Sequence, residues 1–492
     1  MLQRNSLFSA FLYSTCLLIA CSSTAQQGNP TYNAAIEEKI KQVENNLSGH
    51  MHIQDSINTW SLQQRMKEKN IPGVSIAVIH DYKLEWARGY GMADISSQTP
   101  VTTQTLFQAA SISKSLNGVG VLKLAQDKKI DLYADINNYL SSWKFPYDTV
   151  SHGKKISVAN LLSHTAGLTV HGFGGYAKGD KLPTVIQILN GEKPANSAAV
   201  RSQEEPGKRS EYSGGGTTIS QQIIMDVTHQ PYDQYMWQQV LKPLGMNSSS
   251  YTQPPAKDKE KFLSTGYHGN GKEVEGKYHV YPEEAPAGLW TNPTDLSAYI
   301  TETQLSLQGK SNKVLSPEMT KLRLTPYIDS NAALGVFIIE KGGVKYFSHG
   351  GANEGFRSQY YGSIDGGNGV VVMVNSDDGS IMDEIINSVA AVYGWKDFYK
   401  PSERKAVAIT AEMMKAYAGN YVLFNDTVNI SFNGKAMLAV SNGEHYHIYF
   451  SSEQDFFSPE LPFDLKFEKD DDGKVTDIYF KNNGREMRAK RL

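Results

Sequence analysis

Ser111 and Lys114 stand three residues apart in the stretch Ala110–Leu116, and apolar residues continue behind them at helical spacing. This spacing predicts a helix that starts near Ser111 and carries Lys114 one turn later on the same face. A serine hydroxyl becomes a useful nucleophile when a base removes its proton, and a desolvated lysine with a lowered pKa is such a base. A capping serine followed by a surface lysine gives the same pattern, so the pair alone is weak evidence.

A tyrosine and a histidine stand beside glycine-rich turns farther along the chain. Tyr212 precedes the run Ser213–Gly216, and a phenol held over a pocket there can accept or donate a proton. His349 precedes two glycines, whose missing side chains let a substrate lie close against the backbone. A backbone N–H of this segment can complete an oxyanion hole with the N–H of Ser111. Read alone, each motif also fits an ordinary turn with a buried tyrosine ring or a surface histidine.

Strand-like segments flank a helical middle between residues 34 and 398. Residues 34–70 and 105–310 show apolar residues at helical spacing, and another helical run covers 381–393. Strand-like runs occupy residues 74–79, 84–89, 334–339, 344–348, 356–362 and 369–374. We predict an α+β domain over 34–398, in which an antiparallel β-sheet built from both ends is flanked by helices and joined by a mainly helical region.

The last part of the chain differs in character. Residues 399–409 are expected to form a linker, and beyond it the character is all-β, with Val428, Ile430 and Phe432 in alternation. Asn-Gly and Asp-Gly pairs at four places in this last segment are hairpin-turn signals. We therefore predict a small C-terminal antiparallel β-domain, either a barrel or a sandwich.

The order Ser-x-x-Lys, Tyr-Ser, His-Gly-Gly resembles that of the serine β-lactamase-like superfamily. The resemblance is to its branch of class C β-lactamases, D-aminopeptidases and esterases, which are similar to penicillin-binding proteins. It covers residues 34–398 and rests also on the supporting stretches Ile71–Ser75, Leu161–Leu168, Pro286–Trp290 and Asn292–Leu296. Residues 410–492 resemble the small β-domain often appended to members of this group.

The resemblance implies a role for each motif residue. Ser111 is expected to be the acylated nucleophile, and Lys114 and Tyr212 are expected to share its activation and the protonation of the leaving group. Their titrations would be coupled, so the motifs do not decide which of them is the base. His349 takes the place of a family lysine and would contact a substrate carboxylate or tune Tyr212.

The same resemblance assigns substrate-binding roles to the residues that follow His349. Gly351 would lie against the substrate, and the N–H groups of Ser111 and Ala352 would form the oxyanion hole.

Two residues depart from the pattern of the β-lactamases. Gly214 stands where those enzymes usually carry an asparagine that orients the substrate amide, which puts strong β-lactam hydrolysis in doubt. His349 replaces a lysine, and a histidine is mostly neutral near pH 7, so the site is less committed to a carboxylate-bearing substrate. Both changes favour esters or D-amino-acid peptides as substrates.

Other chemistries find little support in the sequence. There is neither a Gly-x-Ser-x-Gly elbow nor a His-Glu-x-x-His motif. His445 and His447 would share a strand face, but no third metal ligand is evident nearby, so we expect no metal and no organic cofactor. A net charge of −3, from 48 basic and 51 acidic residues, gives no basic footprint for nucleic acid. The expected partner is a small-molecule or short-peptide substrate.

The N-terminus is typical of an exported chain. Arg4 precedes an apolar run over residues 7–20, which is shorter than a membrane-spanning helix. Leu18–Cys21 resembles the bacterial lipobox, in which the cysteine becomes the lipidated first residue of the mature protein. We expect a signal peptide over 1–20, a tether over 21–33 and a lipid-anchored protein in the periplasm of the bacterial cell envelope. Ordinary cleavage after Ala25 and an uncleaved anchor are the alternatives.

The sequence thus predicts a serine hydrolase that acts through an acyl-enzyme on ester or amide bonds, including β-lactams, D-amino-acid peptides and esters. One alternative is a penicillin-binding or sensing lipoprotein without turnover, which the changes at Gly214 and His349 motivate. Another is that the C-terminal β-domain is the functional unit and binds a ligand. The sequence leaves the substrate and the oligomeric state open.

Overall fold

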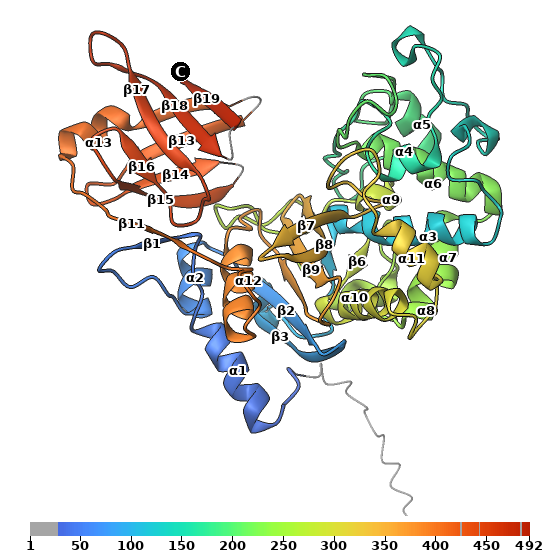
Figure 1. Cartoon of the computed structure of the whole chain (residues 1–492), viewed down its shortest axis with the longest axis horizontal. Helices are drawn as coiled ribbons and strands as arrows, with labels where there is room; N and C mark the ends of the chain where they lie inside the picture. Colours follow the sequence, from blue (N-terminus) through green and yellow to red (C-terminus); the bar gives the residue numbers. More distant parts are fainter. Residues whose placement is uncertain (1–27, 424–425, 442, 483–484) are drawn as a thin grey trace, which may run out of the picture.

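Strands from both ends of the larger domain form one antiparallel sheet (Figure 1). The computed structural model describes residues 28–423, 426–441, 443–482 and 485–492, so Cys21 and the expected signal peptide lie outside the described residues. The strand order is β4-β3-β2-β10-β9-β8-β7. The strands are β2 Gly73–His80, β3 Lys83–Asp94, β4 Thr99–Pro100, β7 Phe337–Lys341, β8 Val344–Asn353, β9 Phe356–Ser363 and β10 Gly369–Val374. The predicted α+β fold with an antiparallel sheet is confirmed.

The central strand β10 sends alternate side chains into two buried layers. Val370, Val372 and Val374 belong to an apolar cluster with residues of α1 (Ala34–Glu44) and α12 (Ile381–Val392). Val371 and Met373 belong to a second cluster on the other face, which includes residues of α10 (Pro293–Leu307). Because helices cover both faces of the sheet, β10 is a continuous apolar run rather than an alternating one.

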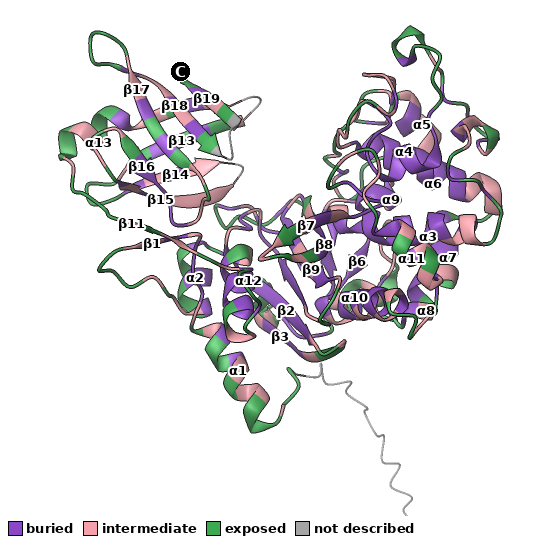
Figure 2. Cartoon of the chain, in the orientation of Figure 1, coloured by how far each residue is buried: buried purple, intermediate pink, exposed green. Residues whose placement is uncertain are grey.

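A mainly helical region lies beside the sheet, and its central helix is buried on all sides. This helix, α3 (Ser113–Gln126), is buried continuously from Ser113 to Leu122 (Figure 2). The other helices of the region are α4 Val158–Leu162, α5 Val185–Asn190, α6 Gly214–Thr228, α7 Tyr232–Met236, α8 Lys242–Leu244, α9 Glu284–Ala287 and α11 Pro317–Arg323. The short strand β5 (Phe107–Gln108) comes shortly before α3 in the sequence. It pairs with β6 (Trp290–Thr291).

The segment between α1 and α2 (Leu62–Glu68) differs from the helix predicted over 34–70. Met51–Ile53 form strand β1, which pairs in parallel with β11 (Ser402–Arg404) inside the expected linker. The Asn58 side chain accepts a hydrogen bond from the Ile53 N–H at 2.7 Å and donates one to the Ile53 carbonyl oxygen at 3.0 Å. Such local side-chain bonds to the backbone compete with helix formation, and here they close a loop.

The C-terminal strands close into an eight-stranded antiparallel barrel. They are β12 Gly419–Leu423, β13 Asp426–Phe432, β14 Met437–Ser441, β15 Glu444–Phe450, β16 Asp455–Phe457, β17 Asp464–Lys469, β18 Val475–Asn482 and β19 Arg485–Arg491. Pairing of β12 with β19 closes the barrel, so of the two predicted forms the barrel is present. The short helix α13 (Ala411–Tyr417) precedes it.

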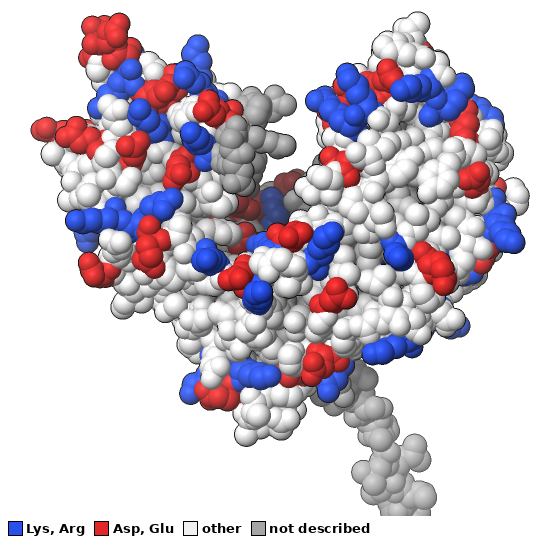
Figure 3. Space-filling model, viewed as in Figure 1, with Lys and Arg blue, Asp and Glu red and all other residues white. Residues whose placement is uncertain are grey.

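Buried charges join the barrel to the larger domain. The Arg65 side chain, 1% exposed, donates to Glu384 of α12 at 2.7 Å and to Glu460 of the barrel at 3.1 Å. The Pro459 carbonyl oxygen accepts a hydrogen bond from the His50 N–H at 2.6 Å. The surface is hollowed between the barrel and the helical region, and acidic and basic side chains are interspersed on the face in Figure 3. Among the described helices, none combines the length and apolar character needed to cross a bilayer.

Candidate active site

The turn that carries Ser111 is strained and held from several sides. Ala110 has φ +48°, a left-handed conformation that is rare for a residue other than glycine and that recurs at functional sites. The preceding Ala109 donates its N–H to the Leu289 carbonyl oxygen at 2.8 Å and accepts from Ser358 Oγ at 2.9 Å. Ser111 then lies in the first turn of a short 3₁₀ segment, Ala110–Ile112, that continues into α3. Its side chain is partly exposed, as a nucleophile requires.

Lys114 lies beneath Ser111 without a carboxylate partner. Its Nζ is 3.0 Å from Ser111 Oγ and donates to the Pro286 carbonyl oxygen at 2.9 Å. The residue is only 4% exposed, and this burial lowers the pKa of Lys114 to about 7. Near neutral pH about half of the amines are therefore unprotonated and can accept the proton of the serine hydroxyl.

Tyr212 covers this pair from the segment that leads into α6. Lys114 Nζ lies 4.8 Å from the centroid of the Tyr212 ring. Burial raises the pKa of Tyr212, and the Ser111 hydroxyl offsets this only in part. The phenol therefore keeps its proton in the resting protein. Lys114 and Tyr212 thus differ in protonation near neutral pH.

His164 is a site residue that the sequence reasoning missed. Its ring lies against that of Tyr212, with centroids 4.4 Å apart and the planes tilted by 37°, and its Nδ1 accepts the Ser213 N–H at 3.2 Å. Burial, followed by the charge of Lys114, holds the pKa of His164 well below its usual value, so the ring is neutral. The stretch Leu161–Leu168 was used only as a mark of resemblance. His164 stands between Ser163 and Thr165, so neither its burial nor its place beside Tyr212 is visible in the sequence.

His349 is buried on β8 beside the same aromatic rings. Its centroid is 6.1 Å from that of Tyr212 and 5.3 Å from that of Phe337. Its Nδ1 lies 2.7 Å from the Gly350 carbonyl oxygen, so Nδ1 carries the proton and Nε2 is left as a buried acceptor. Burial, and then the nearby Lys114, lower the pKa of His349 to about 3. At neutral pH this side chain offers a lone pair rather than a positive charge to a ligand.

The edge of β8 beyond His349 is free of β7. Strand β7 pairs with β8 only up to Ser348, whereas β9 continues to pair as far as Asn353. Asn353 and Phe356 flank a two-residue turn and form its hydrogen-bonded pair, so alternation places Ala352 in a non-hydrogen-bonded pair. The Ala352 N–H consequently faces away from β9, toward the open edge, as an oxyanion-hole donor must.

Gly351 is the position where β8 contacts the turn that carries Ser111. A Cβ on Gly351 would lie 2.2 Å from the Ala109 carbonyl oxygen and 2.4 Å from Ser358 Oγ. Any side chain here would push the strand away from the residues that hold Ser111. Because position 351 is a glycine, the open edge of β8 can lie in contact with the turn that carries Ser111.

Phe173 occupies the space that a side chain at position 214 would need. A Cβ on Gly214 would lie 2.9 Å from Cε2 of Phe173 and 3.4 Å from the His171 carbonyl oxygen. His171 in turn approaches the Tyr212 carbonyl oxygen through Nδ1 at 2.5 Å. The loop that carries these residues thus covers the start of α6, where the β-lactamases usually have their asparagine.

Possible metal ligands lie away from this site. His445 contacts Asp378 at 3.1 Å and His447 contacts Glu460 at 2.8 Å, so the two histidines bind separate carboxylates. In the part of the chain that the structure describes, one other cluster, His268 with Glu354 and Asp377, brings three ligand atoms within 4.8 Å.

Hydrogen bonds and ion pairs already account for this second cluster. Asp377 binds Arg357 at 3.0 Å and accepts the Gly355 N–H at 2.8 Å. His268 Nδ1 lies 2.9 Å from the remaining oxygen of Asp377. The group is therefore an ion-pair network.

Several solved structures share this fold, among them a penicillin-binding protein homologue. The octameric penicillin-binding protein homologue from Pyrococcus abyssi has a TM-score of 0.60 at 19% identity and covers 87% of this chain and 98% of its own. FmtA from Staphylococcus aureus has a TM-score of 0.57 at 18% identity, covering 78% and 96%. SurE with D-Leu has a TM-score of 0.54 at 17% identity, covering 87% and 97%.

The sequence profile of the Beta-lactamase family matches residues 61–392, and the chain belongs to this family. Membership supports acyl-enzyme chemistry of the serine-hydrolase type in general. Protein flp of Staphylococcus aureus (strain N315) is 27% identical over 259 residues, 52% of this chain and 48% of flp. A Beta-lactamase of Providencia stuartii is 27% identical over 262 residues, 51% of this chain and 63% of that protein. The aligned part of this chain spans about half the length of the curated relatives it matches first.

Proposed function

We propose that this chain hydrolyses ester or amide bonds through an acyl-enzyme on Ser111. The observation that carries the proposal is the buried amine of Lys114, 3.0 Å from Ser111 Oγ and with a pKa lowered to about 7. In acylation the Ser111 hydroxyl proton passes to Lys114 Nζ while Oγ bonds to the substrate carbonyl carbon. The oxyanion then accepts hydrogen bonds from the N–H groups of Ser111 and Ala352.

Tyr212 acts as the proton donor to the leaving group in this scheme. Its raised pKa keeps the phenol protonated, and its ring lies over the amine that has just gained a proton. As the carbon–leaving-group bond breaks, the phenol proton moves to the leaving group, and the Lys114 ammonium replaces it. A water molecule then attacks the acyl carbon by the reverse route and frees Ser111.

The surroundings of the site favour substrates without a fixed anionic group. The neutral His349 supplies no charge for a carboxylate, and Phe173 fills the place of an amide-orienting side chain at Gly214. We therefore propose esters and D-aminoacyl amides ahead of β-lactams. The D-Leu present in the related SurE structure supports including the D-aminoacyl class in a substrate screen.

Labelling with a fluorophosphonate probe tests the proposal. Purified residues 22–492 should be labelled at Ser111, as located by mass spectrometry, and Lys114→Ala should lose most of the label. The matched control is Lys123→Ala, on the same helix but bound to Asp127 at the surface, which should label normally. Labelling that does not need Lys114 contradicts the assignment of the base. A folded sample that does not label at all supports the alternative of a sensing protein without turnover.

We propose further that Cys21 is lipidated and holds the protein at the bacterial membrane on its periplasmic side. Leu18–Cys21 and the apolar run before it support this. Mass spectrometry of the protein from its host should find an N-terminal diacylglyceryl cysteine, and Cys21→Ser should release it from the membrane fraction. An N-terminus at Gln26, after cleavage behind Ala25, would contradict the proposal.

A further inference from the structure

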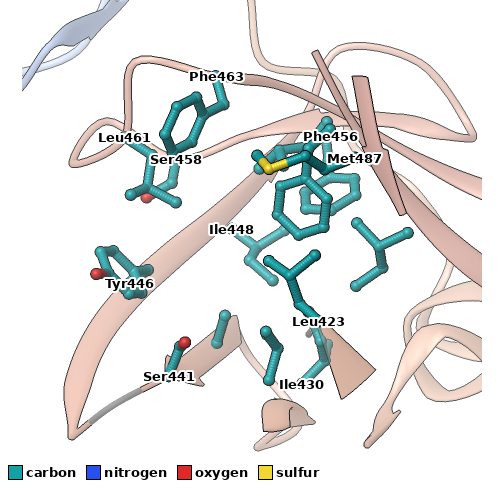
Figure 4. Close-up of a pocket in the computed structure, with 15 residues that line it drawn as sticks. Leu423, Ile430, Ser441, Tyr446, Ile448, Phe456, Ser458, Leu461, Phe463 and Met487 are labelled. Carbon is teal, nitrogen blue, oxygen red and sulfur yellow. The ribbon is translucent and has the colours of Figure 1, made fainter. Parts of the chain in front are cut away.

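One half of the barrel interior is filled and the other half is empty. Phe467 stacks on Tyr417 with centroids 4.2 Å apart and on Phe456 at 4.3 Å, which plugs the end near α13. The opposite half contains a cavity of about 160 Å³ that is partly open to solvent (Figure 4). Protein interiors are normally close-packed, with few voids larger than a water molecule. A cavity of this size is therefore a candidate ligand-binding site.

Most of the side chains that line this cavity are apolar. Its lining consists of Leu423, Val428, Ile430, Ala439, Ser441, Tyr446, Ile448, Phe456, Ser458, Leu461, Phe463, Leu465, Ile478, Phe480 and Met487. None of these described lining residues is charged. Apolar cavities of about 150 Å³ stay free of water and bind molecules of the size of benzene.

The polar side chains of the lining lie along one side of the cavity, with Tyr446 between Ser441 and Ser458 (Figure 4). Ser441 ends β14, Tyr446 is near the start of β15, and Ser458 follows β16. Ser441 Oγ donates to Asp426 at 2.5 Å and Ser458 Oγ donates to Glu460 at 2.6 Å, so both hydroxyl hydrogens are already used. The two serine oxygens can still accept a hydrogen bond from a ligand.

We propose that this cavity binds a small uncharged amphiphile, with an apolar chain of about six carbons inside and one hydroxyl group on the side that Ser441 and Ser458 line. The chain length follows from the cavity volume, since a benzene-sized void holds about six heavy atoms. The hydroxyl follows from the free acceptors, and the absence of charge follows from a lining that would leave an anion unpaired. Straight-chain primary alcohols are the probes that match this description.

Binding of alcohols to the whole protein, followed by saturation-transfer NMR, tests the proposal. Affinity should rise about fourfold for each methylene group added from 1-butanol to 1-hexanol, because each added group leaves water. Hexanoate should bind at least tenfold more weakly than 1-hexanol. A series without this dependence on length, or equal binding of hexanoate, would overturn the assignment, as would the absence of binding at millimolar alcohol.

A pair of matched variants locates the site. Ala439→Leu fills the cavity and should abolish binding, whereas Ala436→Leu makes the same change at an exposed position of the hairpin and should leave it unchanged. If Ala439→Leu does not fold, as judged by circular dichroism, Val428→Phe fills the cavity from another strand and serves in its place. Binding that persists in a folded cavity-filling variant would show that the alcohol sits elsewhere.

Discussion

Lys114→Met should inactivate the protein and yet stabilise it at neutral pH. The pKa of this lysine falls from 10.5 to about 7 on folding because its amine is buried. At pH 7 the unfolded chain holds this proton fully, whereas about half of the folded chains have lost it, and the difference in pKa costs about 4 kcal/mol. The variant removes this cost but leaves the Pro286 carbonyl oxygen without its donor, which costs about 2 kcal/mol. The expected net gain at pH 7 is about 2 kcal/mol.

The sign of this effect should reverse at high pH. Below pH 7 both states are protonated and the penalty is complete, and it declines as the pH approaches 10.5, where the unfolded chain also loses its proton. At pH 10 it is about 1 kcal/mol, so the variant should then be about 1 kcal/mol less stable than its parent.

Urea denaturation followed by tryptophan fluorescence measures this difference. All six tryptophans lie at or before Trp395, so the signal reports the larger domain and not the barrel. Lys123→Met, on the exposed side of the same helix, is the control and should change stability equally at both pH values. If the difference between Lys114→Met and its parent is also the same at pH 7 and pH 10, Lys114 does not carry a lowered pKa and the reasoning is refuted.

Three further predictions concern the pH profile, the strand edge and the barrel. The rate of Ser111 labelling should rise tenfold per pH unit below pH 7 and reach only about 1% of its plateau at pH 5, because Lys114 must be unprotonated; a flat profile would exclude this amine as the base. Gly351→Ala should slow labelling at least tenfold, whereas Gly350→Ala, whose new Cβ meets mainly the flexible end of a glutamine, should not; equal rates would remove the need for close approach. Glu460→Ala should cost about 1–3 kcal/mol, because Arg65 loses one of its charged partners but keeps Glu384; urea denaturation of the whole chain measures this, and an unchanged midpoint would contradict the charge network.

The sequence predicted those features that depend on local pattern. The alternation of strands and helices at the two ends of the larger domain was sufficient to infer one sheet, and spacing alone placed Ser111 and Lys114 on one helix face. The hairpin signals likewise gave the antiparallel character of the C-terminal domain. The type of each element is set by neighbours within a few residues along the chain, whereas the joining of strands from both ends into one sheet was inferred as the most economical arrangement.

Features that depend on distant contacts could not be predicted. The helical spacing of Ile53, Ile57 and Trp60 is genuine, but pairing with β11 and the bonds of Asn58 override it. Barrel closure depends on β12 meeting β19, which hairpin turns do not encode. His164 belongs to the site because its ring lies against that of Tyr212, 48 positions later. Nothing in the sequence around His164 shows this contact.

The order of strands in the sheet determines how long the nascent chain stays incomplete during synthesis. Strand β2 must find β10, whose first residue is 289 positions farther on, before the centre of the sheet exists. At about 5–20 residues per second, synthesis of that interval lasts roughly 15–60 s. During this time the hairpin of β2 and β3 has an unpaired apolar edge, which is the kind of surface that chaperones recognise and that aggregates form from. A nascent chain released before β10 therefore has no way to complete its sheet, however well its helices form.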